Sequence, residues 1–275
     1  RQRQMCIRDR STVAEKSQHS DIEYRALCVA ARDMENGIIN VLRFYEAPNA
    51  LVFANTRVMV NRLTTRLTNR GFSVVSLSGE LSQTERSHAL QAMRDGRARI
   101  CVATDVAARG IDLPNLDLVV HAELPTNYEI LMHRSGRTGR AGRKGISVLI
   151  IPPSARRKAE RILQGAKVLA EWAAPPSAYE VKVRDRERLM ADPSWQEEIN
   201  SKEKLDVEDL LSHFTPLQIA AAYLRLYTSK QSAPEELIAI DSDNFKDNKA
   251  SRTADFGPTV WFSICLLYTS DAADE

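Results

Sequence analysis

The 275-residue sequence lacks several features that would place it in other classes of protein. Its four cysteines are scattered and form no CxxC pair, so neither a zinc site nor a disulfide framework is indicated. No apolar run approaches the roughly 20 residues that span a bilayer, and no apolar segment of a secretory signal is evident. A lysine-bearing phosphate loop of the GxxxxGK[ST] type is also missing. We therefore expect no membrane partner and a reducing, cytoplasmic environment.

What is present is the composition of a globular protein. Hydrophobic residues make up 43% of the chain and charged residues 27%, enough for one or two domains with a substantial core. The net charge is only +2, so the overall composition does not indicate a nucleic-acid binder. Whether the chain binds nucleic acid has to be judged from the local distribution of charge.

From about Asn49, short apolar runs alternate with amphipathic segments. Strands are predicted at residues 50–53, 74–77, 100–103, 118–120 and 147–150. The helices between them carry clear signals, such as the capping box Ser82–Glu85 and a glycine, Gly71, where a helix C-cap would lie. Strands that are apolar on both faces and alternate with helices predict an α/β fold with a parallel sheet covered on both sides. Ligands of such sheets bind at the carboxyl ends of the strands.

The segment His133–Arg140 (HRSGRTGR) is the strongest candidate for a functional site. Five basic side chains and no acid lie between Arg134 and Lys144. The glycines let the backbone turn tightly, and guanidinium groups donate in a plane to phosphate oxygens. A solvated basic loop is the alternative, but the regular spacing of Gly and Arg favours phosphate binding.

HRSGRTGR resembles the last motif of the DEAD-box RNA helicases, which begins with His where related helicase families usually have Gln. The resemblance implies that Arg137 and Arg140 act as arginine fingers on the γ-phosphate of ATP, and that His133 and Arg134 lie at the nucleotide. Positive charge placed where negative charge develops speeds phosphoryl transfer by about 10³–10⁵ in well-studied NTPases. Ser135 stands where the family often has an apolar residue.

A second motif, TDVAARGID, directly follows a predicted strand and so lies at the ligand-facing edge of the sheet. It resembles the family's motif almost residue for residue. The resemblance implies RNA contacts for Thr104 and Asp105. It implies nucleotide contacts for Arg109, Gly110 and Asp112, with Asp112 accepting from the ribose hydroxyls. Read alone, the segment is a strand-to-helix loop with Asp105 as the helix N-cap, and capping and function can coexist.

Two weaker motifs complete the set. Gln83 and Arg86 lie three residues apart near a helix N-terminus, whose N–H groups suit a phosphodiester backbone. The family uses such a Gln-x-x-Arg pair and the preceding glycine, here Gly79, for RNA backbone contact. Thr56, at the end of VFANT, resembles a further RNA-contacting position; alone it would be read as an N-cap. The four motifs occur in family order across about residues 49–151.

The resemblance implies a RecA-like α/β domain over residues 49–153, with a mainly helical extension at 154–237. The family holds the ATP phosphates and Mg²⁺ in a first RecA-like domain, through a phosphate loop and an Asp-Glu-Ala-Asp motif, and neither motif occurs here. We therefore expect a fragment of an ATP-dependent RNA helicase that cannot hydrolyse ATP alone. Residues 11–48 would connect it to the missing first domain, its expected partner besides RNA.

The rest of the chain is less specific. The extension resembles that of bacterial cold-shock-type members, where such helices can mediate dimerisation, so a homodimer is a candidate assembly. Residues 238–255 are polar and predict a linker, and residues 256–264 resemble the truncated first strand of a small RNA-binding domain. Residues 1–10 and 265–275 resemble translated sequencing-adapter sequence and are expected to be foreign.

Two alternatives stay open. A DNA-translocating helicase of a related superfamily shares the general architecture, although His133 and the TDVAARGID wording argue against it. A non-catalytic RNA-binding module would not need Arg137, Arg140 or Asp112. Neither the RNA substrate nor the pathway can be read from the sequence.

Overall fold

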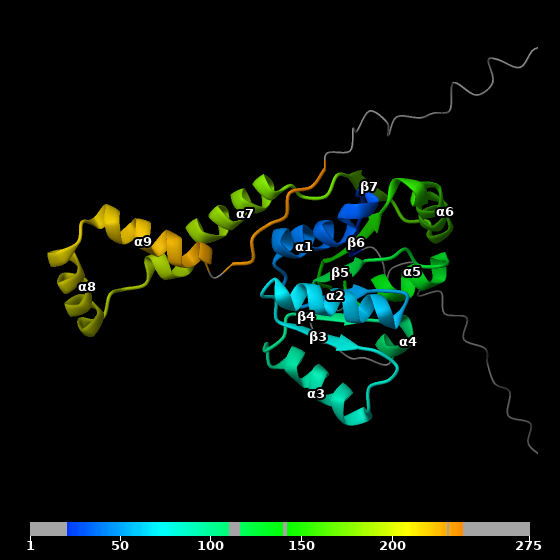
Figure 1. Cartoon of the computed structure of the whole chain (residues 1–275), viewed down its shortest axis with the longest axis horizontal. Coiled ribbons are helices and arrows are strands. Elements are labelled where there is room, and N and C mark those ends of the chain that lie inside the picture. Colours follow the sequence, from blue (N-terminus) through cyan, green and yellow to red (C-terminus); the bar gives the residue numbers. More distant parts are fainter. Residues whose placement is uncertain (1–20, 110–115, 140–141, 230, 239–275) are drawn as a thin grey trace, which may run out of the picture. The chain divides into compact units, whose positions relative to one another are not determined.

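The computed structural model describes residues 21–109, 116–139, 142–229 and 231–238. Within these ranges, seven parallel strands form one sheet in the order β3-β4-β2-β5-β6-β1-β7 (Figure 1). The strands are β1 (Ile22–Cys28), β2 (Ala50–Phe53), β3 (Val74–Leu77), β4 (Ile100–Ala103), β5 (Leu118–His121), β6 (Gly145–Ile151) and β7 (Ala170–Ala173). The predicted α/β fold with a parallel sheet is confirmed.

Helices alternate with the strands and then continue alone. The helices are α1 (Met34–Tyr45), α2 (Arg57–Asn69), α3 (Gln83–Arg94), α4 (Asp105–Ala108), α5 (Tyr128–Ser135), α6 (Arg156–Ala166), α7 (Ala178–Met190), α8 (Ser201–His213) and α9 (Pro216–Ser229). Short 3₁₀ turns lie at Ala31–Asp33, Pro153–Ala155 and Pro193–Gln196. None of the described helices is long and apolar enough to cross a bilayer.

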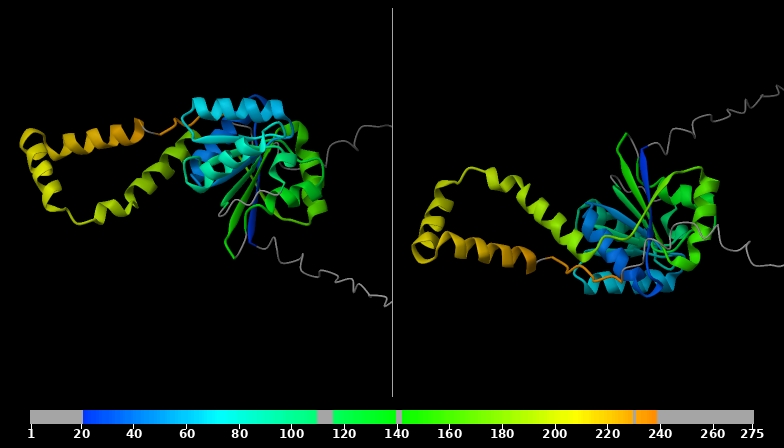
Figure 2. Two further views of the ribbon diagram at one scale, coloured as in Figure 1. Left: turned by 90° about the horizontal axis from the view of Figure 1, so that it is seen from below. Right: turned by 90° about the horizontal axis from the view of Figure 1, so that it is seen from above.

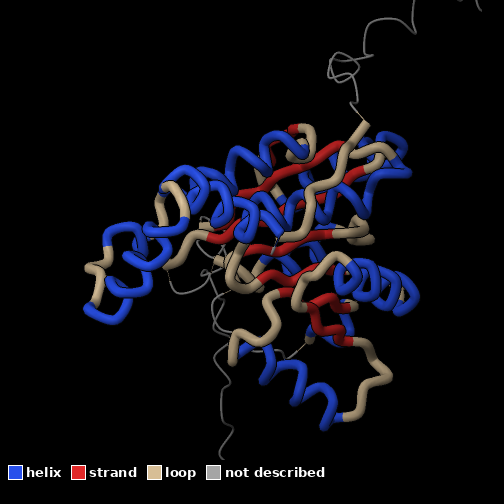
Figure 3. Tube along the Cα trace, turned by 60° about the vertical axis from the view of Figure 1, so that its left-hand side comes forward, coloured by secondary structure: helices blue, strands red, loops and turns tan. Residues whose placement is uncertain are grey.

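Helices cover both faces of the sheet (Figures 2 and 3). Successive strand residues point to opposite faces. In β2, Val52 packs with α1 and α2, whereas Leu51 and Phe53 pack with α3 and α4. On that second face, α5 and α6 cover β1 and β6. Because both faces are buried, the interior strands are apolar on both sides, which is why the sequence revealed them.

The structure corrects the start of the domain. Residues 11–48 were expected to be a connector, but β1 lies inside the sheet, paired with β6 on one side and β7 on the other. Helix α1 is also part of the core, with Ile38, Ile39 and Val41 fully or almost fully buried. The charged residues Glu23 and Arg25 interrupt the apolar pattern of β1. They share one face of the strand, where Glu23 is exposed and the half-buried Arg25 lies over the Tyr45 ring at the end of α1.

The end of the domain is corrected as well. Residues from 154 onward were assigned to the extension, but Ala159, Ile162 and Leu163 of α6 are buried against the sheet, and β7 is its edge strand. The RecA-like unit therefore runs to Ala173. The extension begins with α7, which packs on α1.

The extension is tied to α1 at both ends through one buried side chain. The amide of Asn40, which is fully buried, donates to the carbonyl oxygens of Pro176 (2.9 Å) and Glu235 (2.8 Å) and accepts from the N–H of Glu235 (2.8 Å). Arg43, also buried, pairs with Asp185 of α7 at 2.7 Å and donates to Gln231 at 2.9 Å. The segments before α7 and after α9 are thus fixed at one place on the domain.

Several expectations lie outside the described residues. These are the foreign ends at 1–10 and 265–275, the truncated strand at 256–264, and all but the first residue of the linker at 238–255.

Candidate nucleotide and RNA site

The candidate site lies at the carboxyl edge of the sheet, where four adjacent strands end in register. Phe53 pairs with Ala103 on one side and with His121 on the other, and Ala103 pairs with Leu77. Two positions beyond these strand ends stand, in sheet order, Gly79, Asp105, Asn55 and Glu123. Three of the four motifs recognised in the sequence, those with Thr56, Gly79 and Asp105, therefore meet at one edge of the sheet, as ligand sites of parallel sheets do. The fourth motif, His133–Arg140, is joined to this edge by hydrogen bonds from Arg134 to Asp105.

Thr56 and Gly79 lie on neighbouring loops of this edge. Thr56 is the N-cap of α2, and its Oγ1 accepts from the N–H of Met59 at 3.2 Å, so the capping prediction is confirmed. The next residue, Arg57, forms an ion pair with Glu80, which follows Gly79. This pair, which the sequence analysis did not identify, joins the start of α2 to the loop after β3.

Helix α3 presents Gln83 and Arg86. The predicted capping box is confirmed: Ser82 Oγ accepts from the N–H of Glu85 at 3.2 Å, and the Glu85 carboxylate accepts from the N–H of Ser82 at 2.8 Å. The hydrogen bonds from Ser82 also lower the pKa of Glu85. Gln83 opens the helix and is exposed. Arg86 points away from its own helix, and its Nη2 donates to the carbonyl oxygen of Arg109 at 2.7 Å.

The N-cap of α4, the helix after β4, is not the residue that the sequence predicted. Thr104, not Asp105, is the N-cap of α4, and its side chain accepts from the N–H of Ala107 at 3.4 Å. Asp105 is the first residue of the helix, so its carboxylate is available for a different contact. Arg109 ends this short helix and is exposed.

That contact is with Arg134, the most extensively hydrogen-bonded side chain of the site. Its Nε and Nη2 each donate to one oxygen of Asp105 at 2.6 Å. Nη2 also donates to Asn55 Oδ1 at 2.8 Å, and Nη1 donates to the carbonyl oxygen of Glu123 at 3.0 Å. The guanidinium lies over the Phe53 ring, 5.1 Å from its centroid. Arg134 is only 2% exposed, so these partners enclose most of its side chain.

The arginine loop after α5 is held against the body of the domain. Thr138 is buried, and its hydroxyl donates to the carbonyl oxygen of Leu116. Gly139 has φ +66°, and a Cβ there would come within 2.6 Å of Ile22 Cγ1, so glycine is required both by the backbone and by the neighbouring strand. This fixed turn sets the position of Arg137, which is half-buried and directly precedes Thr138.

A buried polar trio lies beneath the loop. Ser147 Oγ lies 2.9 Å from Ser135 Oγ and 3.0 Å from His121 Nε2, and all three residues are fully buried. Burial, together with the charge of Arg134, lowers the pKa of His121 well below its usual range, so the imidazole is neutral. The polar Ser135 is explained by Ser147, its partner on β6.

These elements enclose a pocket of about 330 Å³ lined by Phe53, Asp105, Ala108, Arg109, Ile130, His133, Arg134 and Arg137. Its cationic lining fits the phosphates of a nucleotide. In the described part of the chain, no group of His, Cys, Asp or Glu side chains is placed to hold a metal ion. The predicted residues Arg109, His133 and Arg137 are thus brought together. Gly110, Asp112 and Arg140 lie outside the described residues.

A parallel sheet of this order, covered by helices on both faces, is a RecA-like fold, and the basic pocket lies at its carboxyl edge. Residues 34–142 match the family model described as "Helicase conserved C-terminal domain". The match begins at the first residue of α1, so it includes this helix of the core but not β1.

Two curated RNA helicases and one solved DEAD-box structure are similar to this chain. The chain is 50% identical over 100 residues to "DEAD-box ATP-dependent RNA helicase 53" of Oryza sativa, covering 36% of this chain and 16% of the relative. It is 34% identical over 171 residues to "ATP-dependent rRNA helicase RRP3" of Scheffersomyces stipitis, covering 62% and 35%. The structure of E. coli DEAD-box protein SrmB bound to regulator of ribonuclease activity A matches with TM-score 0.53 and 28% identity, covering 58% of this chain and 93% of that chain.

Residues 34–142 are thus similar to a helicase C-terminal domain, and the similar proteins are DEAD-box and other ATP-dependent RNA helicases. The matched part spans only 16% to 35% of the length of the two curated relatives.

Proposed function

We propose that this chain is the second motor domain of an ATP-dependent RNA helicase, which closes on ATP with arginine fingers and grips the RNA backbone. One observation carries the proposal. The pocket containing Arg109, His133 and Arg137 lies at the same sheet edge as the candidate RNA contacts of α2 and α3.

The nucleotide side of the proposal rests on charge. Arg137, together with Arg140, would face the γ-phosphate of an ATP whose other phosphate contacts come from a first RecA-like domain. Guanidinium groups there stabilise the negative charge that spreads over the phosphoryl oxygens in the transition state. Mg²⁺ would neutralise the phosphates from the first domain. Because this chain supplies neither the phosphate loop nor the metal ligands, it should bind ATP weakly and not hydrolyse it alone.

The RNA side rests on backbone recognition. Gln83 at the N-terminus of α3 and the N–H groups of that helix suit phosphate oxygens, and so do Arg86 and the glycine loop at Gly79. Thr56 and Thr104 present hydroxyls at the starts of α2 and α4. None of these groups reads a base, so we expect sequence-independent binding that is strongest when the motor closes.

The test joins this chain to a first RecA-like domain carrying a phosphate loop and an Asp-Glu-Ala-Asp motif. RNA should stimulate ATP hydrolysis by the two-domain protein and support strand separation, whereas the chain alone should show no turnover. Stimulation by DNA and not RNA would favour the DNA-translocating alternative. RNA binding with no turnover would favour a non-catalytic binding module.

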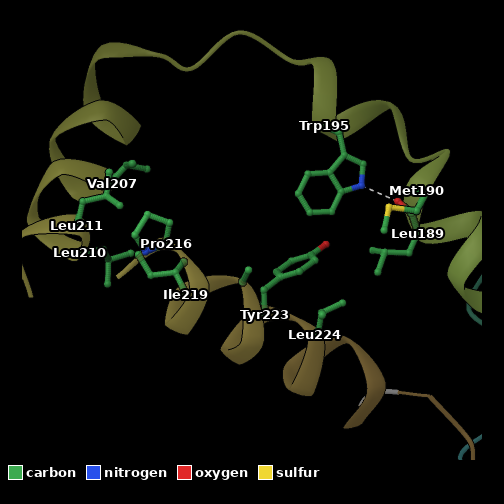
Figure 4. Close-up of a pocket in the computed structure, with 11 residues that line it drawn as sticks. Leu189, Met190, Trp195, Val207, Leu210, Leu211, Pro216, Ile219, Tyr223 and Leu224 are labelled. Carbon is green, nitrogen blue, oxygen red and sulfur yellow. Dashed lines mark hydrogen bonds between the residues drawn. The ribbon is translucent and has the colours of Figure 1, made fainter. Parts of the chain in front are cut away.

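The helical extension favours a second role, in assembly. Helices α8 and α9 have no buried residue. Their apolar side chains border a groove of about 580 Å³ lined by Leu189, Met190, Trp195, Val207, Leu210, Leu211, Pro216, Ile219, Ala220, Tyr223 and Leu224 (Figure 4). Trp195 packs edge-on against Tyr223 at 5.5 Å between ring centroids. A contiguous apolar surface of this kind marks an interaction site. We propose that a second copy of this chain covers it.

Sedimentation equilibrium tests the assembly. Leu211→Asp, on the groove, should convert a dimer into a monomer. Leu169→Asp, at a 97% exposed residue outside the extension, should leave the dimer intact. A wild-type chain that is monomeric at high micromolar concentration would exclude homodimerisation. The further assignment to a bacterial cold-shock-type helicase rests on the sequence resemblance, and the assignment to the cytoplasm rests on the scattered cysteines.

A further inference from the structure

Arg134 connects loops that follow three different strands. Asn55 follows β2, Asp105 follows β4 and Glu123 follows β5, and Arg134 itself lies on α5. Each partner stands two residues beyond the end of its strand. One side chain therefore fixes the spacing of four segments at the carboxyl edge.

Those segments carry the candidate ligand contacts. Asn55 precedes Thr56, and Asp105 lies between Thr104 and Arg109. On α5, Arg134 is three residues before Arg137. Asn55 is held a second time, because its backbone N–H donates to Glu123 Oε2 at 2.7 Å. Loops assigned to RNA and loops assigned to the nucleotide thus share one buried anchor.

The chemistry of the anchor leaves little for a ligand. A guanidinium has five N–H groups. Arg134 makes four hydrogen bonds through Nε, Nη1 and Nη2, two of them to the same carboxylate. Its charge is compensated by Asp105, and its upper face is covered by Phe53. Four of the five N–H groups are thus used, so a phosphate could form a bidentate contact with this group only by displacing one of these partners.

We infer that Arg134 and Asp105 form a clasp that holds the RNA-contacting loops and the arginine loop as one unit, and that Arg134 positions Arg137 without binding the nucleotide. The inference rests on the proposed function and refines it. RNA bound at Thr56 or Thr104 would then also fix the arginine loop through the clasp. RNA binding would thus order the RNA-contacting loops and place Arg137 at the same time.

The buried trio supports this geometry from below. Ser135, the neighbour of Arg134, is held by Ser147 of β6. The Phe53 ring contacts the Arg134 guanidinium and also stacks with the His121 ring, with 6.2 Å between the two ring centroids. The end of α5 is therefore attached to the sheet independently of the clasp, so weakening the clasp should loosen loops without detaching the helix.

The first experiment uses the two-domain protein with Arg134→Lys, Asp105→Asn and the double variant. Lysine keeps the charge but cannot reach two carboxylate oxygens, an amide and a carbonyl together. Each single variant should lower kcat by about tenfold or more, as small misplacements of catalytic groups do. The ATP dissociation constant, measured with a fluorescent ATP analogue, should change less than about twofold. The double variant should be no worse than the singles, because the pair acts as a unit.

Arg43→Lys is the matched control. Arg43 is equally inaccessible, at 4% exposed, and pairs with Asp185 far from the carboxyl edge, beside the start of β2. It should lower the melting temperature as Arg134→Lys does and leave kcat unchanged below that temperature. A loss of ATP affinity in Arg134→Lys that Asp105→Asn does not share would make Arg134 a nucleotide ligand and overturn the clasp, while the helicase function stands.

A second measurement is independent of catalysis. In this chain alone, Arg134→Lys should speed amide hydrogen exchange in the loops at 54–57, 104–109 and 122–125 together, and Arg43→Lys should not. Faster exchange confined to α5 would refute the clasp even if the two-domain protein proved inactive. If the wild-type two-domain protein shows no RNA-stimulated ATP turnover while hydrogen exchange changes as expected, the helicase function is refuted and the clasp is not.

Discussion

The guanidinium of Arg86 donates to the backbone carbonyl oxygen of Arg109 at 2.7 Å, so a candidate RNA contact on α3 is attached to the last described residue of the loop assigned to the nucleotide. An arginine engaged with a carbonyl keeps its full charge and its other N–H groups for a phosphate. RNA can therefore add to this contact without breaking it, and the two candidate sites need not compete for Arg86.

We expect Gln83→Ala combined with Arg86→Ala to weaken RNA binding by the two-domain protein nearly equally for all sequences, because backbone contacts position a protein without reading bases. The dependence of affinity on salt should become shallower, since one fewer phosphate charge is neutralised. Fluorescence anisotropy with several labelled oligonucleotides measures both effects. Arg184→Ala, at an exposed arginine of α7, is the control. A loss confined to one RNA sequence would contradict the phosphate assignment.

The arginine fingers give the largest expected effect. Arg137→Ala or Arg140→Ala should remove most ATP turnover, by about 10³-fold or more if the fingers work as in other NTPases. Lysine at either position should fail too, because it lacks the planar fork. ATP affinity should fall less than turnover. The isolated domain should stay folded, with its stability changed by no more than about 0.5 kcal/mol if the loop behaves as a surface segment. Near-normal turnover in the double variant would show that the loop has no catalytic role.

Stability should depend on pH through His121. Burial lowers the pKa of this imidazole in the folded state, whereas in the unfolded chain it is about 6.5. As the pH falls through about 6.5, the unfolded state binds a proton that the folded state does not, so the folded state loses stability toward acid by at most about 1.4 kcal/mol per pH unit. Urea unfolding between about pH 7.5 and about pH 5.5 should show this slope.

The control for that slope is a pair of variants. His121→Gln should remove this component, whereas His88→Gln, at an exposed histidine of α3, should keep it. If His121→Gln leaves the slope unchanged, another group is responsible for it.

The two described cysteines should be unreactive in the folded protein. Burial raises the pKa of Cys101 to about 12 and also raises that of Cys28. The thiolate is the reactive species, so at neutral pH neither should be alkylated by iodoacetamide until the chain unfolds. Peptide mass spectrometry with and without urea measures this. Rapid labelling of Cys101 under native conditions would mean that β4 opens locally.

Much of the fold was predictable, because interior parallel strands are apolar on both faces and leave short, unmistakable runs such as Ala50–Phe53. The strands that were missed explain the limit. In β1, the exposed Glu23 and the half-buried Arg25 break the apolar run, and β7 is an edge strand with the exposed residues Glu171 and Trp172. Their pairing partners are far away in the sequence, and local patterns carry no information about them.

The candidate site was found through its motifs, and its internal contacts were not. Asn55 and Glu123 were missed, although a polar residue two positions after each buried strand is a usable signal once the strands are known. Arg134 was assigned to the nucleotide through the resemblance of its motif. Its carboxylate partner, Asp105, lies 29 residues earlier in the chain, and only the fold brings the two together.

The single asparagine that holds Pro176 and Glu235 makes the chain between them a closed excursion. Both ends of this excursion meet on α1, and α7 packs there through buried residues such as Val181 and Asp185. Helices α8 and α9 have no buried residue, so the segment from Ser201 to Ser229 can change in length or content with little consequence for the sheet. Loop length adds only slowly to the cost of closure, about 0.6 kcal/mol per doubling. The two helices can therefore be replaced, and the chain can acquire new partners, while the carboxyl edge of the sheet stays as it is.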